Sequence, residues 1–71
     1  MFPTLAQTIL IHALQGDFKN YTLDLDELSL EELQGMYKYV SETALQLQNN
    51  TLFSKNIMQA QMIILLMLIA E

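Results

Sequence analysis

The chain has 71 residues, of which 52% are hydrophobic and 15% are charged, and its formal net charge is −5. It contains no cysteine and only one histidine, His12, which excludes disulfides and thiolate metal sites. Its three lysines and lack of arginine argue against direct binding to nucleic acid or to an anionic membrane, because such contacts need clustered cations. We expect a single helical domain over residues 1–71 whose apolar excess is covered by a second molecule, since a core this small supplies only about 3–5 kcal/mol.

A first helix is predicted over residues 3–15. Leu5, Ile9 and Ala13 recur at a spacing of four residues, so they lie on one face of a helix. Gly16 follows this stretch and can adopt the left-handed conformation that ends many helices. We therefore expect the helix to end there.

Residues 16–29 are predicted to form a connector. Tyr21, Leu23 and Leu25 alternate with polar residues, which is the period of a β-strand. One short strand without a partner is unstable, so an extended connector is expected. A helical turn capped by Asp24 and Glu27 is the alternative, and the pattern leaves both open.

The second predicted helix covers residues 30–49. Ser29 and Glu32 have the spacing of a capping box, in which a hydroxyl and a carboxylate each accept a hydrogen bond from a backbone N–H. Its apolar seam has the heptad spacing of a packed helix and comprises Leu33, Tyr37, Val40, Ala44 and Leu47. Tyr37 therefore belongs to the buried side and Tyr39 to the exposed side. Gly35 is expected to be tolerated rather than required.

A turn at residues 49–51 should precede the third predicted helix, over residues 53–70. We expect an asparagine in the left-handed conformation at the turn and a cap from Thr51 or Ser54. Residues 62–70 are nine consecutive apolar residues. The uncharged stretch 57–70 extends over about 21 Å, which is shorter than the bilayer core of about 30 Å. No membrane span is expected.

The predicted fold is therefore all-α, with three helices in an up-down-up arrangement. Two neighbours cannot cover a helix that is apolar on every side, so we expect dimerisation to complete a larger helical bundle. The third helix would supply the oligomer interface through its apolar residues, namely Ile57, Met58, Met62, Leu65, Leu66 and Ile69.

No catalytic, cofactor-binding or metal-binding constellation is expected. His12 is predicted to be a structural, hydrogen-bonded histidine, because no second ligand or base lies at a suitable spacing on its helix. A calcium loop starting at Asp24 fails, since its fifth and sixth positions hold Leu28 and Ser29 instead of an oxygen ligand and glycine. The methionines are expected mainly to fill the core.

The expected function is non-enzymatic protein–protein interaction by a small acidic cytoplasmic protein, as an adaptor, inhibitor or assembly subunit that also self-associates. No secretory signal is expected, since the first basic residue of this sequence is Lys19. Expected contacts with another protein lie on the second helix, at Glu31, Lys38, Tyr39 and Glu42. A transcriptional or antitoxin-type regulator is the first alternative, and a small subunit of a membrane complex is the second.

Overall fold

The computed structural model describes residues 2–71, with side chains from residue 5 onward, as an all-helical chain. Its helices are α1 (Phe2–Leu14), α2 (Phe18–Asp26), α3 (Leu30–Gln46) and α4 (Ser54–Ala70). Within residues 2–71 there is no strand. The all-α fold class is thus confirmed, whereas the expectation of three helices and a connector at 16–29 is wrong, because that connector contains α2.

Helix α2 forms because its first turn is capped and its apolar residues share one face. The Asp17 carboxylate accepts hydrogen bonds from the backbone N–H of Asn20 at 3.3 Å and from its side-chain amide at 2.8 Å. Tyr21 and Leu25, one helical turn apart, are both buried. Leu23, on the other side of the helix, is 54% exposed. The alternating pattern that resembled a strand therefore consists of two core residues, Tyr21 and Leu25, and one surface residue, Leu23.

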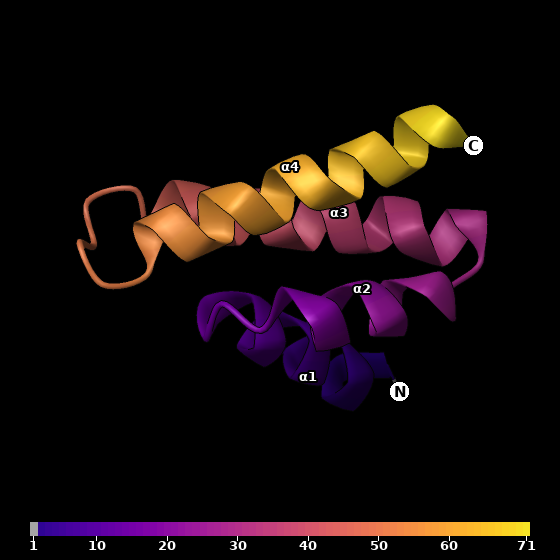
Figure 1. Cartoon of the computed structure of the whole chain (residues 1–71), viewed down its shortest axis with the longest axis horizontal. Helices are drawn as coiled ribbons and strands as arrows, with labels where there is room; N and C mark the ends of the chain where they lie inside the picture. Colours follow the sequence, from indigo (N-terminus) through magenta and orange to yellow (C-terminus); the bar gives the residue numbers. More distant parts are fainter. Residues whose placement is uncertain (1) are drawn as a thin grey trace.

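The helices form two pairs. In Figure 1, α3 and α4 run antiparallel to one another and are joined by the loop at residues 47–53, while α1 and α2 form the pair below them. Helix α4 contacts each of the other three helices, and α1 makes its main contacts with α2 and α4. Helix α4 is thus the element on which the two pairs are assembled.

The buried core draws on every helix. Its buried hydrophobic residues are Ala6, Ile9, Ala13, Tyr21, Leu25, Leu33, Met36, Val40, Ala44, Ile57, Ala60 and Ile64. The radius of gyration, 11.1 Å, matches the value of about 11 Å expected for a compact domain of this length. A single chain therefore builds a closed core. The predicted seam of the second helix is correct at Leu33, Val40 and Ala44, which are buried. Tyr37 and Leu47 are only half-buried, and α3 ends before Leu47, while Met36 is buried although it was not predicted. Tyr39 is half-buried as well, so the expected contrast between a buried Tyr37 and an exposed Tyr39 is wrong.

Hydrogen bonds between helices fix their relative positions. The Tyr21 hydroxyl donates to the carbonyl oxygen of Ala60 at 2.8 Å and so connects α2 to the middle of α4. The Asn56 amide donates to the carbonyl oxygen of Leu14 at 2.9 Å, at the end of α1. No described buried side-chain N or O atom lacks a hydrogen-bond partner. The polar side-chain atoms that these helices bury are therefore all hydrogen-bonded.

Two predicted helix ends are confirmed. Gly16 has φ of 75°, the left-handed conformation, and follows the end of α1. The capping box at the start of α3 is complete: the Ser29 N–H donates to Glu32 Oε1 at 2.9 Å, and the Glu32 N–H donates to Ser29 Oγ at 3.2 Å. Local sequence alone fixes both of these ends.

The turn between α3 and α4 differs from the prediction. No residue other than glycine has a positive φ in the described part of the chain, so no asparagine adopts the left-handed conformation. Instead, Asn50 Oδ1 accepts hydrogen bonds from the backbone N–H groups of Leu52 and Phe53, both at 2.9 Å. Phe53 is the N-cap of α4, and neither Thr51 nor Ser54 caps that helix. Asparagine thus closes this turn through its side chain rather than its backbone.

Candidate functional site

The outward side of α4 is an apolar surface that the single chain leaves uncovered. Four large hydrophobic residues on it are more than half exposed: Met58 at 60%, Met62 at 56%, Leu66 at 57% and Ile69 at 71%. We call these four residues the α4 outer face. Leu65, at its edge, is half-buried.

Helical geometry explains why the α4 outer face cannot enter the core of the same chain. The core residues of α4 are Ile57, Ala60 and Ile64. Met62 lies two residues from both Ala60 and Ile64, which is about 200° around the helix. Polar residues do not recur with the helical period in the second half of this helix, so it has no polar side there. The residues opposite the core are therefore as apolar as those within it.

The six residues predicted to form the oligomer interface thus have different positions. Ile57 is fully buried in the core of its own chain, so its side chain is not available to a second copy. Met58, Met62, Leu66 and Ile69 are exposed together, and Leu65 borders them. Sequence reasoning selected this helix correctly as the apolar one but did not separate its inner side from its outer side.

The α4 outer face continues onto α3 at one point. Leu45 on α3 is 67% exposed. Together with Met58 and Gln61 it lines a shallow hollow of about 370 Å³ between α3 and α4. Leu45 was not among the predicted interface residues, because the sequence alone does not show that it lies beside Met58.

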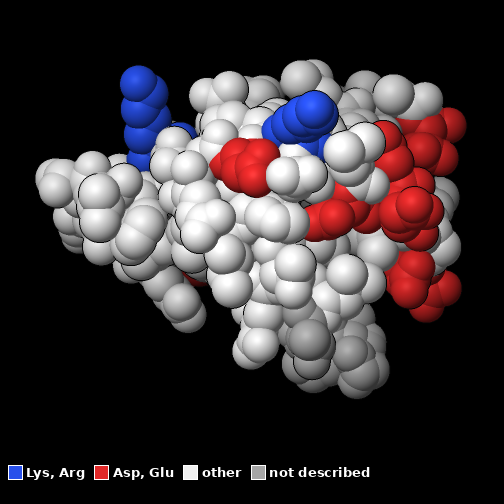
Figure 2. All heavy atoms as spheres, turned by 60° about the horizontal axis from the view of Figure 1, so that its bottom comes forward, with Lys and Arg blue, Asp and Glu red and all other residues white. Residues whose placement is uncertain are grey.

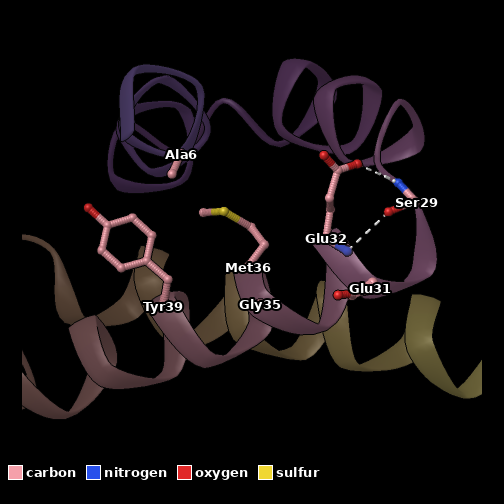
Figure 3. Close-up of a pocket in the computed structure, with 7 residues that line it drawn as sticks. All are labelled: Ala6, Ser29, Glu31, Glu32, Gly35, Met36 and Tyr39. Carbon is pink, nitrogen blue, oxygen red and sulfur yellow. Dashed lines mark hydrogen bonds between the residues drawn. The ribbon is translucent and has the colours of Figure 1, made fainter. Parts of the chain in front are cut away.

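The four predicted partner-contact residues on α3 do not lie on one common surface. Glu31 and Tyr39 line a pocket of about 590 Å³, whereas Lys38 and Glu42 are exposed on α3 outside it. Figure 3 shows the pocket beneath α1, with Tyr39 and Glu32 on either side of Met36. The described residues that line it are Ala6, Ser29, Glu31, Glu32, Gly35, Met36 and Tyr39. The contribution of Ala6 from α1 could not be read from a helical pattern.

The charge is distributed unevenly. Figure 2 shows most of its acidic side chains toward one end of the molecule, with a separate acidic side chain lying beside a lysine away from that end. Five acidic residues fall in the short segment 24–32, which spans the end of α2 and the start of α3 and contains no lysine or arginine. Elsewhere, hydrogen bonds from Asn20 hold the pKa of the Asp17 carboxyl below its ordinary value. Burial raises the pKa of the Tyr21 hydroxyl above its ordinary value.

His12 is hydrogen-bonded, as predicted. Its Nδ1 lies 2.8 Å from Asp24 Oδ2 and links α1 to α2, with both side chains about a quarter exposed, at 25% and 29%. The described residues contain no group of three His, Cys, Asp or Glu side chains arranged to hold a metal ion. Within residues 2–71, none of the helices combines the length and the apolar character that crossing a bilayer requires.

Comparisons with protein-family models, with curated proteins and with solved structures gave no significant match to this chain. The functional argument therefore depends on the surfaces described above.

Proposed function

We propose that this protein is a non-enzymatic helical interaction module that self-associates through the α4 outer face. The observation that carries the proposal is the exposure of Met58, Met62, Leu66 and Ile69 on one side of one helix. Contiguous apolar patches of this kind on monomers commonly mark interaction sites. The non-enzymatic part rests on composition, because a chain with no cysteine and one histidine has few side chains that can act as nucleophile, acid or base near neutral pH.

The spacing of the exposed residues fits a helix–helix contact. Met58, Met62, Leu65 and Ile69 follow one another at intervals of four, three and four residues, which is the a/d repeat of a coiled-coil seam. The seam extends for about 16 Å along the helix. A second copy presents the same surface, so a two-fold axis beside α4 covers both seams at once. Leu45 lies next to Met58 and widens the contact area.

The matched pair Leu66→Asp and Leu23→Asp tests this proposal. Leu66 is 57% exposed on α4 and Leu23 is 54% exposed on α2, so each aspartate is introduced at a similarly exposed helical position. Neither change buries a charge within the single chain, and circular dichroism should show folded helices for both variants. Light scattering after size exclusion should give a monomer for Leu66→Asp and a dimer for the wild type and for Leu23→Asp.

Two results would contradict the proposal. One is a wild-type chain that remains at its monomer mass of 8.2 kDa at millimolar concentration. The other is a folded Leu66→Asp variant that associates as strongly as Leu23→Asp, which would place the contact on a different surface.

A further inference from the structure

The pocket between α1 and α3 exists because two small residues face it and because the helices around it pack elsewhere. Helix α1 packs mainly on α2 and α4, while α3 packs mainly along α4. Ala6 and Gly35 line the space that is left. A Cβ atom at Gly35 would have no neighbour within 4 Å, so none of the described side chains fills this part of the pocket. No residue of α4 lines the pocket, and it is therefore separate from the α4 outer face.

The lining combines an apolar floor with an acidic rim. Met36, which is only 3% exposed, lies at the floor, and the half-buried Tyr39 ring stands beside it. Glu31 and Glu32 supply two carboxylates, and the capping box holds Glu32 in place through its Oε1 atom. None of the described lining residues is basic, so among them these carboxylates have no cation within the pocket.

We propose that this pocket binds a small amphipathic organic cation, namely a primary ammonium group on an aromatic or short alkyl stem. The volume of about 590 Å³ falls within the usual range for small-molecule sites. The ammonium group pairs with the rim carboxylates of Glu31 and Glu32, and the stem extends past Met36 toward the Tyr39 ring at the other side of the pocket. The stem contacts Met36 and the bare backbone at Gly35. The acidic segment 24–32 repels anions from this end of the molecule.

Nuclear magnetic resonance tests the proposal, because the chain has only two glycines and they lie in different places. Gly35 lines the pocket, whereas Gly16 lies in the turn after α1, next to Asn56. The probe is phenethylammonium chloride. Saturable shifts of the Gly35 amide and the Met36 methyl group, with the Gly16 amide unchanged, are expected. Equal, non-saturating shifts at both glycines would contradict a defined site.

Two analogues of the probe, one uncharged and one negatively charged, test whether the pocket requires a cation. Phenethyl alcohol keeps the stem without the charge and should bind about fivefold more weakly. Phenylpropanoate carries the opposite charge and should not shift Gly35. Equal affinity of all three probes would overturn the cation assignment and reduce the pocket to an apolar hollow.

Variants then test the position of the ligand. Glu32→Gln keeps the capping box, because glutamine also fits that motif, but it removes a rim charge. It should weaken phenethylammonium binding about threefold to fivefold, while Glu42→Gln, outside the pocket, should change it little. Gly35→Leu fills the pocket and should abolish the Met36 shift, whereas the neighbouring Gln34→Leu should not. Equal effects within either pair of variants would refute the site.

Discussion

Replacing Tyr21 with phenylalanine gives a sharp test of how α2 is attached to α4. The Tyr21 side chain is fully buried, and its hydroxyl donates to the carbonyl oxygen of Ala60 at 2.8 Å. Removing this hydrogen bond should lower the free energy of unfolding by about 0.5–1.5 kcal/mol at neutral pH. The loss stays small because the Ala60 carbonyl lies inside α4 and so has a helical N–H as a further partner.

The destabilising effect of the same substitution should shrink in alkali. Burial raises the pKa of Tyr21 above the ordinary value of 10.0, so the folded chain keeps a proton that the unfolded chain loses above that pH. The contribution of Tyr21 to the free energy of unfolding is therefore complete below pH 10 and declines as the pH rises further. Tyr21→Phe removes this dependence. By about pH 11 the wild type should have lost about 1.4 kcal/mol relative to the variant, which cancels most or all of its advantage.

Urea unfolding followed by circular dichroism at several pH values between about 8 and 11 measures both effects. Tyr37→Phe is the matched control, because Tyr37 is only half-buried and lies on α3. The Tyr37→Phe variant should lose free energy of unfolding in alkali just as the wild type does. A gap between the wild type and Tyr21→Phe that stays constant with pH would refute the reasoning.

Three further substitutions test local features of the fold, each by urea unfolding. Gly35→Ala should raise the free energy of unfolding by about 0.5–1 kcal/mol, because the added Cβ meets no atom within 4 Å and alanine favours a helix; a loss of stability would contradict the open space described there. Ser29→Ala should lower it by about 1 kcal/mol, since one half of the capping box is lost, and an unchanged value would mean that the box contributes nothing. Gly16→Ala should lower it by more than about 1 kcal/mol, because φ is 75° and the new Cβ would lie 3.3 Å from Asn56; tolerance of alanine would mean that this turn relaxes.

The sequence predicts most of the helical content but not the helix at residues 18–26. Ser29 with Glu32 and Gly16 mark helix ends through local chemistry, and both are confirmed. Helix α2 was missed because Leu23 makes Tyr21 and Leu25 resemble an alternating strand. The cap from Asp17 to Asn20 was the available signal for it. The Asp24 partner of His12 could not be found without α2, since it comes from that helix.

The candidate surfaces were predictable only in part. The composition of residues 57–70 identifies an unusually apolar helix, but it does not show which side the chain covers. That distinction depends on where α1, α2 and α3 contact α4, and it places Ile57 inside the core and Met62 outside it. The pocket depends on the distance between α1 and α3, which no periodicity in the sequence reports.

The central claim is that the α4 outer face contacts a second copy of the chain, and the methionine methyl groups test it most directly. Met58 and Met62 are 60% and 56% exposed on that face, whereas Met36 is 3% exposed in the core. In a mixture of isotope-labelled and unlabelled protein, an isotope-filtered nuclear Overhauser experiment detects only contacts between copies. The account predicts intermolecular signals at the Met58 and Met62 methyl groups and none at Met36. Their absence from Met58 and Met62 at millimolar concentration would contradict it.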